Sequence, residues 1–144
     1  MRKEMFDSIC KNYGILTAYI FGSMTEEGAA CLEGGISGKM QDPLADIDLG
    51  VVFLERPLSP EERIKTYGRL YSEMSEIFSP YPLDIIFLQE TGVILQFEAI
   101  NGLPVYIFDE DKRLEYEEHV IKLYQDWKPD YEQYKKEVLE AIAG

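Results

Sequence analysis

The pattern that most constrains this chain is a long amphipathic helix between two short apolar strands. Ser59, followed by a proline and two glutamates, is typical of a helix start, with a serine cap and proline in the first helical position. Apolar side chains then recur at helical spacing and predict a helix over residues 60–78. Strand patterns precede and follow it at 46–54 and 83–88, and the second strand is apolar except for Asp84. Strands and helices in this order predict an α/β fold.

Weaker patterns complete the domain on both sides of this helix. The expected elements are a helix over 2–12, a strand over 15–21, a loop over 24–44, a short helix over 90–101, a strand over 104–108 and a helical tail over 110–142 that breaks at Pro129. Together they predict the α/β (α+β) class, with a small mixed sheet, flanking helices and a C-terminal helical tail. The length fits one domain over 1–144, with its core at about 13–108.

The balance of charge limits the partners of such a domain. The chain has 27 acidic and 14 basic side chains, a net charge of −13. A surface this negative repels nucleic acid and anionic membranes, and no apolar stretch is long enough to span a bilayer. We therefore expect neither contact, and favour a basic protein partner or cations held by clustered carboxylates. A generally acidic, solubilising surface is the simpler alternative.

The cysteines and the first residues indicate the compartment. Cys10 and Cys31 lie in different contexts and lack metal-ligand spacing. The opening Met-Arg-Lys-Glu is not followed by the apolar run of a signal peptide. Free thiols without a secretion signal are typical of a reducing environment, so we expect a cytoplasmic protein.

Three aspartates are the candidates for chemistry. Asp46 and Asp48 lie two residues apart on a predicted strand, so both side chains leave the face opposite its apolar residues. Neighbouring carboxylates repel each other, and a divalent cation is the usual compensation. Asp84 can reach the same cation if its strand pairs beside strand 46–54. Oxygen ligands suit Mg²⁺ or Mn²⁺, although two solvated acids are the simpler interpretation of Asp-x-Asp alone.

A Gly-Ser pair strengthens the case for a phosphate site. Gly22 and Ser23 directly follow the apolar strand 15–21. A glycine there lets the backbone approach a phosphate closely, and the amides and the serine hydroxyl can donate to its oxygens. Each motif is weak alone, but the order strand, Gly-Ser, loop, Asp-x-Asp strand, helix and Asp-containing strand is specific.

This order resembles the DNA polymerase β-like nucleotidyltransferase superfamily. It is most similar to the minimal nucleotidyltransferases, stand-alone domains often paired with HEPN-domain toxins in prokaryotes. The matching segments are Phe-Gly-Ser at 21–23, Ala-Asp-Ile-Asp-Leu at 45–49 and Leu-Asp-Ile at 83–85. The resemblance runs from about Tyr13 to Phe108. It implies a polymerase β-like fold, Mg²⁺ (or Mn²⁺) as cofactor and a nucleoside triphosphate, ATP by preference, as substrate.

The resemblance also implies a role for each matching polar residue. Gly22 and Ser23 would hold the nucleotide phosphates. Asp46 and Asp48 would hold the catalytic metal. Asp84 would complete one metal site and draw the proton from the attacking hydroxyl. The reaction would move a nucleoside monophosphate, usually AMP, to a hydroxyl of a HEPN-type toxin, and the chain would act as its antitoxin.

Two departures from the family pattern keep a second function open. The family usually has a basic residue just after Gly-Ser, where this chain has Met-Thr-Glu-Glu, and Lys39 or Arg69 is the candidate substitute. The gap between Gly22 and Asp46 is also longer than usual. The alternative is a non-catalytic module of this fold that neutralises a basic partner, and a homo-oligomer also stays open. A small-molecule nucleotidyltransferase fits less well, because such enzymes usually carry a further substrate-binding domain.

Other residues that could carry chemistry have simpler interpretations. His119 is the single histidine and is expected on the surface of the tail. No Gly-x-Ser-x-Gly elbow supports a Ser-His-Asp hydrolase. The tail tyrosines recur at helical spacing, which favours core or partner contact over base stacking. Asp109 and the two acids after it are expected to start the tail helix.

Overall fold

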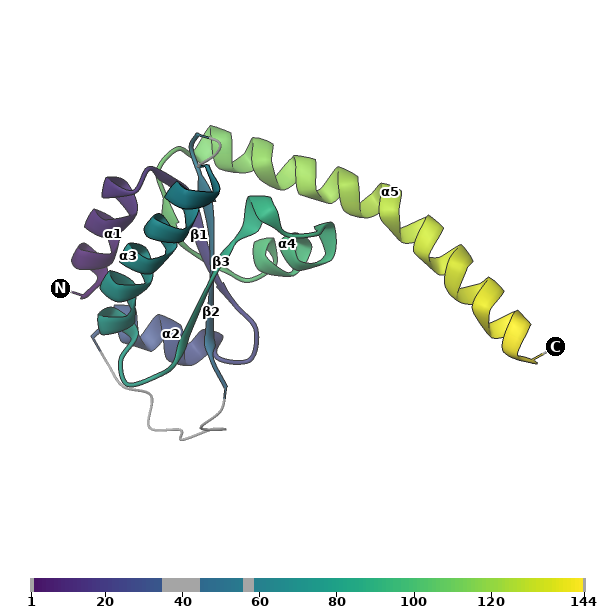
Figure 1. Ribbon diagram of the computed structural model, residues 1–144, viewed down its shortest axis with the longest axis horizontal. Coiled ribbons are helices and arrows are strands. Elements are labelled where there is room, and N and C mark those ends of the chain that lie inside the picture. The colour runs from purple at the N-terminus through teal and green to yellow at the C-terminus, as the bar shows by residue number, and fades with distance from the viewer. Residues whose placement is uncertain (1, 35–44, 56–58, 144) are drawn as a thin grey trace.

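The computed structural model describes residues 2–34, 45–55 and 59–143, and it contains a four-stranded sheet with helices on both faces (Figure 1). The elements in chain order are α1 (Arg2–Asn12), β1 (Ile15–Phe21), α2 (Thr25–Leu32), β2 (Ile47–Phe53), α3 (Pro60–Phe78), β3 (Leu83–Phe87), the short 3₁₀ helix η1 (Leu88–Glu90), α4 (Val93–Ile100), β4 (Leu103–Ile107) and α5 (Glu110–Ala143). The strand order is β3-β2-β1-β4, in which β2 and β3 are parallel and the other pairs are antiparallel. The predicted α/β fold with a small mixed sheet is confirmed.

Helix α3 is the connection that places β3 beside β2. Parallel neighbours need a crossover, and α3 carries the chain from the end of β2 back to the start of β3. It begins where the sequence predicts, because the Ser59 hydroxyl accepts a hydrogen bond from the Glu62 N–H at 3.3 Å. Leu70 and Met74 of α3 are fully buried in the core. The helix therefore fixes the position of both strands.

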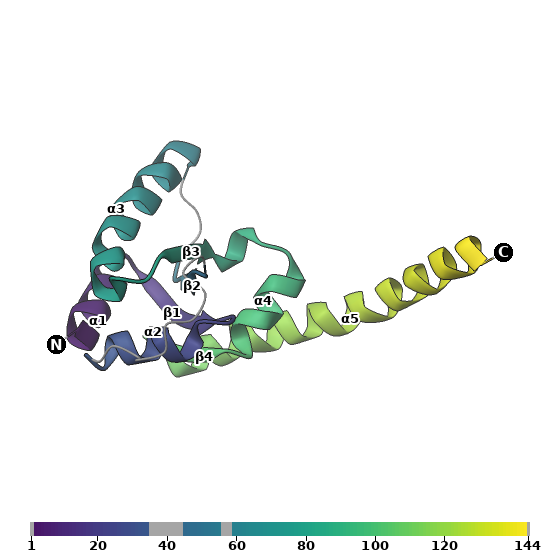
Figure 2. The ribbon, with the colours of Figure 1, turned by 90° about the horizontal axis from the view of Figure 1, so that it is seen from below.

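The sheet separates two apolar clusters. Ile47, Leu49 and Val51 of β2 belong to the cluster that also contains side chains of α1, α2 and α3, and their burial confirms the predicted core face. Tyr19 and Leu88 belong to the second cluster, which is covered by α4 and the first half of α5 (Figure 2). Side chains alternate along a strand, so Asp48, which lies between Ile47 and Leu49, points toward the α4 face.

Helix α2 is the main difference from the sequence prediction. We predicted a loop over 24–44, but Thr25–Leu32 form a helix. Gly28 lets this helix lie close to the sheet, since a Cβ there would be 3.0 Å from a β1 side chain. A glycine and the buried Glu27 on the inner face hide the apolar periodicity by which the other helices were found. Residues 35–44 of the predicted loop lie outside the described residues.

Helix α5 is one continuous helix of 34 residues that extends well beyond the rest of the molecule (Figures 1 and 2). The predicted break at Pro129 is wrong. Proline removes one backbone hydrogen bond and crowds the preceding turn, but Pro129 is exposed and good helix formers continue the helix on both sides. His119 is exposed, as predicted. In the part of the chain that is described, no helix is both long and apolar enough to cross a bilayer.

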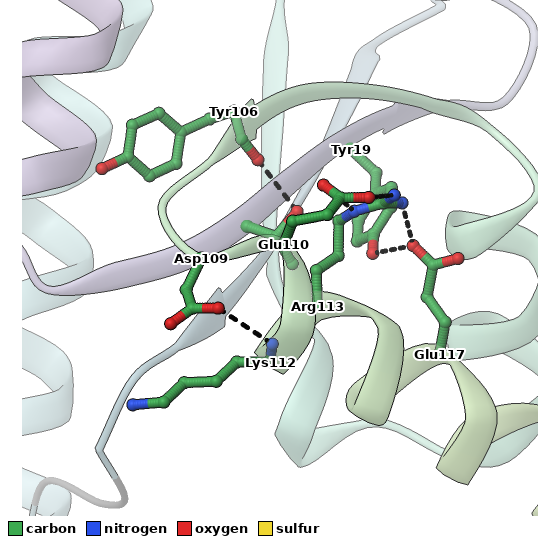
Figure 3. Close-up of polar contacts among 8 residues, drawn as sticks. Tyr19, Tyr106, Asp109, Glu110, Lys112, Arg113 and Glu117 are labelled. Carbon is green, nitrogen blue, oxygen red and sulfur yellow. Dashed lines mark hydrogen bonds and ion pairs between the residues drawn. The ribbon is translucent and has the colours of Figure 1, made fainter.

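A polar network attaches the base of α5 to β1 (Figure 3). Tyr19 is fully buried, and its phenol donates a hydrogen bond to Glu117 Oε2 at 2.7 Å. Arg113 forms ion pairs with Glu117 and with Glu110. Asp109 accepts a backbone N–H of the first turn at 3.1 Å and caps the helix, as its acidic sequence predicts. The start of the tail is therefore fixed to the body of the protein.

Candidate active site

Two of the three predicted aspartates lie side by side on neighbouring strands. Asp48 of β2 is the register partner of Asp84 of β3. Parallel partners point to the same face, and their backbones are about 4.8 Å apart. Both side chains therefore leave the sheet on the α4 face, away from Ile47 and Leu49. The pairing on which a shared cation site depends is present.

Asp46 adds a third carboxylate to this pair. Strand β2 begins at Ile47, so Asp46 directly precedes the strand and does not lie on it as predicted. Burial raises the pKa of Asp48, and the charges of Asp84 and then Asp46 raise it further. Burial and then the charge of Asp46 raise the pKa of Asp84. Three like charges thus act on one another at the start of two strands.

The Gly-Ser corner lies against one of these carboxylates, that of Asp48. Phe21, the last residue of β1, pairs with Asp48 across the antiparallel register. Gly22 has φ +84°, and a Cβ at this position would lie 2.5 Å from Asp48 Oδ2. Ser23 is exposed beside it, and the Thr25 hydroxyl donates to the Gly22 carbonyl at 2.8 Å. The positive φ favours glycine at this corner, and any larger residue would push the end of the Asp48 side chain aside.

The carboxylates fit a hard divalent cation in donor type and in backbone position. Oxygen ligands from two adjacent strands suit Mg²⁺, and a cation offsets the repulsion among Asp46, Asp48 and Asp84. Within residues 2–34, 45–55 and 59–143, no three His, Cys, Asp or Glu side chains already form a metal-binding group. The three carboxylates would therefore have to rotate toward a shared ion, as the two torsions of each aspartate side chain allow.

Two further residues near the site had no signal in the sequence. Glu98 of α4 acts on Asp48, and its charge raises the pKa of that carboxyl by a smaller amount than the aspartates do. Burial and then the charge of Asp84 raise the pKa of the Tyr67 phenol, although Tyr67 belongs to α3. Both residues come from helices that meet the strands only in the folded chain, and helical spacing indicates no more than a core position for Tyr67.

Arg69, one of the two substitutes considered for the missing basic residue, lies away from the site. In the described part of the chain, every charged group that shifts the pKa of Asp48 or Asp84 is a carboxylate. Burial raises the pKa of Tyr13, and the charge of Arg69 partly offsets this rise. Tyr13 precedes β1, at the opposite end of that strand from Gly22. Lys39 lies outside the described residues.

A cavity elsewhere in the molecule does not contain the predicted residues. It has a volume of about 560 Å³ and is lined by Tyr13, Phe53 and Phe87, among others. Phe53 ends β2 and Phe87 ends β3, so this cavity lies at the opposite end of both strands from Asp48 and Asp84. The carboxylate pair, with its specific neighbours, is the better candidate for chemistry.

Residues 4–113 match the family described as "Polymerase beta, Nucleotidyltransferase". The match spans well over half of the sequence, so the chain belongs to the polymerase β nucleotidyltransferase family. No curated protein sequence matches the chain significantly.

Chains of solved toxin–antitoxin structures have the same fold. One, described as a toxin–antitoxin with AMP-PNP, has a TM-score of 0.65 at 15% identity, with 96% of this chain and 99% of that chain covered. The MntA-HepT toxin–antitoxin has a TM-score of 0.61 at 14% identity, with 96% and 97% covered. A tri-AMPylated Shewanella oneidensis HEPN toxin in complex with an MNT antitoxin has a TM-score of 0.61 at 15% identity, with 96% of each chain covered. At these identities the likeness establishes the fold. The resemblance to minimal nucleotidyltransferases is confirmed.

Proposed function

We propose that this chain is an active nucleotidyltransferase that moves AMP from ATP to a hydroxyl of a HEPN-type toxin and thereby acts as its antitoxin. The observation that carries the proposal is the register of Asp48 with Asp84, beside the glycine corner at Gly22. Family membership gives the reaction class, and the carboxylates give it a site. The toxin and the nucleotide follow the relatives, which are described with AMP-PNP and with an AMPylated HEPN toxin.

The residues of the site would divide the work as follows. The exposed backbone at Gly22 and the hydroxyl of Ser23 bind and orient the triphosphate through hydrogen bonds to its oxygens. Asp46, Asp48 and Asp84 would hold a divalent cation, Mg²⁺ or Mn²⁺, which would neutralise charge on the reacting phosphate. Asp84 lies on the edge strand β3 and accepts the proton of the attacking hydroxyl.

The bond changes are those of a nucleotidyl transfer. The oxygen of the acceptor hydroxyl forms a bond to the α-phosphorus, and the bond from that phosphorus to the bridging oxygen breaks. Pyrophosphate leaves with the bridging oxygen, and the hydroxyl proton goes to the carboxylate. Placement and charge neutralisation are the main contributions of the protein to such a reaction.

The net charge of −13 supports a protein acceptor with a basic surface. Opposite net charges speed the encounter of two proteins, whereas a nucleic acid acceptor would be repelled. The buried, free Cys10 and Cys31 are consistent with the proposal of a cytoplasmic protein.

One observation favours a second candidate, a binding module without catalysis. The charged groups that shift the pKa of Asp48 and Asp84 are carboxylates, so no described cation there shares the charge of a triphosphate. Such a module would form a tight complex with the toxin and leave it unmodified.

Transfer of label from ATP separates the two candidates. The chain would be incubated with Mg²⁺, ATP labelled in the α-phosphate and the HEPN protein of the same organism. Label should appear on the HEPN protein, and Asp48→Asn should lower the rate roughly 10²-fold or more. The control Asp111→Asn changes an exposed acid at the start of α5 and should leave the rate unchanged. A stable complex that never takes up label would refute the enzyme and support the module.

A further inference from the structure

The exposed half of α5 continues an apolar face whose first half is already covered. Val120 is fully buried, and Tyr124 stacks on Phe97 of α4 with ring centroids 3.8 Å apart and an angle of 3° between the rings. Trp127 follows at the next helical step and stacks on Tyr131, with centroids 4.7 Å apart. The spacing of three and four residues places these side chains on one face of the helix.

Beyond Trp127 the same face is exposed. We call its residues the tail stripe; they are Tyr131, Tyr134, Val138 and Ile142. Their exposed fractions are 46%, 65%, 38% and 78%. The stripe begins where the cover provided by α4 ends, and it therefore continues an interface that the protein already has.

We propose that the tail stripe binds one amphipathic helix of a different, net basic protein. This inference rests on the proposed function, in which that protein is the HEPN toxin. The occupant would extend the packing of α4 along α5, with apolar residues at spacings of three and four against the stripe.

The charges beside the stripe argue against an antiparallel second copy of this chain. By helical geometry, Lys128 and Lys135 lie along one side of the stripe, and Asp130 and Glu137 lie along the other. In an antiparallel pair of identical helices, each side faces the same side of the partner, so lysines would meet lysines and acids would meet acids. Like charges across such an interface are unfavourable.

The position of α4 argues against a parallel second copy. In a parallel pair the two helices would meet along the whole face, but α4 already lies on this face over the first half of α5 (Figures 1 and 2). Both copies of α4 would need the same space beside Val120 and Tyr124. A helix from another protein has neither conflict, and the net charge of −13 favours one that is basic.

The test measures binding of the HEPN protein of the same organism by isothermal titration calorimetry. The double variant Tyr134→Ala with Ile142→Ala should weaken binding by about 100-fold, because it truncates two large contacts in the centre and at the end of the stripe. Alanine favours helix, and circular dichroism checks that α5 is retained. The matched control Lys136→Ala lies on the opposite face of α5 and should change the affinity less than about threefold. Equal affinities of the wild type and the double variant overturn the proposal.

Sedimentation velocity of the chain alone tests the other occupant. The wild type should remain a monomer, and a dimer that the double variant dissociates would overturn the proposal in favour of a second copy. The Asp48→Asn variant separates this inference from the proposed function, since it should bind like the wild type and transfer label roughly 10²-fold more slowly or not at all. If the stripe carries binding but the wild type transfers no label, only the enzyme is refuted. If label is transferred but the double variant binds normally, or no complex forms, only the stripe is refuted. Absence of both complex and label refutes both proposals.

Discussion

Replacement of Gly22 by alanine tests whether the glycine corner serves the carboxylates. Two separate effects are built into this position. The backbone has φ +84°, which costs an L residue about 1–2 kcal/mol. The new Cβ would also lie 2.5 Å from Asp48 Oδ2, where ordinary contact begins at 3.4 Å. The Asp48 carboxylate therefore has to move by about 1 Å, and the Cβ then restricts the rotation by which this carboxylate would turn toward a shared ion. A misplacement of that size can reduce a catalytic rate by roughly 10²-fold.

The two effects predict different losses in stability and in activity. A cost of about 1–2 kcal/mol should lower the melting temperature of a domain of this size by roughly 3–10 °C. Nucleotidyl transfer, measured with labelled ATP at a temperature where the variant stays folded, should fall by roughly 10²-fold. Circular dichroism gives the melting curve, and the same protein sample provides the rate.

Gly14 is a matched control for the backbone effect. It has φ +67°, and a Cβ there would have nothing within 4 Å. Gly14→Ala should therefore lose a similar amount of stability and keep its transfer activity. If Gly22→Ala loses no more activity than Gly14→Ala, the contact between Gly22 and Asp48 has no catalytic meaning and the reasoning is refuted.

Three further predictions concern the tail and its attachment. Tyr19→Phe removes the hydrogen bond to Glu117 and should lower the free energy of unfolding by about 1–3 kcal/mol in urea titrations; an unchanged value would contradict the network. Burial and then the hydrogen bond to Glu117 raise the pKa of Tyr19 above 10, so the unfolded chain loses this proton first. The stability that Tyr19 contributes is complete below pH 10 and should decline as the pH rises above it. The free energy of unfolding should therefore fall less between pH 9 and pH 11 in Tyr19→Phe than in the wild type. Pro129→Ala restores a backbone N–H in the middle of α5 and should slow amide hydrogen exchange in the turns around it; unchanged exchange would show that the proline costs the helix nothing.

Local signals in the sequence predict the elements whose causes are local. The Ser59 cap fixes the start of α3, and the apolar runs of β1 and β2 need no knowledge of their neighbours. Helix α2 could not be found in this way, because its inner face contains Gly28 and Glu27 in place of large apolar residues. Gly28 is explained only by the close approach of this helix to the sheet, which the sequence does not show. Pro129 is the reverse case, because its local preference against helix is outweighed by the helix-forming residues on both sides.

The candidate site divides along the same line. The sequence places Asp46 and Asp48 together because they are neighbours in the chain, and family resemblance adds Asp84. The register that brings Asp84 beside Asp48 is a property of the folded sheet. Glu98 comes from a helix that reaches the site only through tertiary packing, so a pattern along the chain could not indicate it.

Helix α5 gives the molecule a fixed reach. Its 34 residues form a rod of roughly 50 Å, at about 1.5 Å per residue. The hydrogen bond between Tyr19 and Glu117 attaches this helix to β1. Tyr19 lies two residues before Phe21, which pairs with Asp48. A protein that binds the C-terminal end of α5 is held at a fixed distance from the aspartates. Only a hydroxyl on a segment long enough to span that distance can reach them. The length of α5 would then determine which hydroxyls of a partner can be modified.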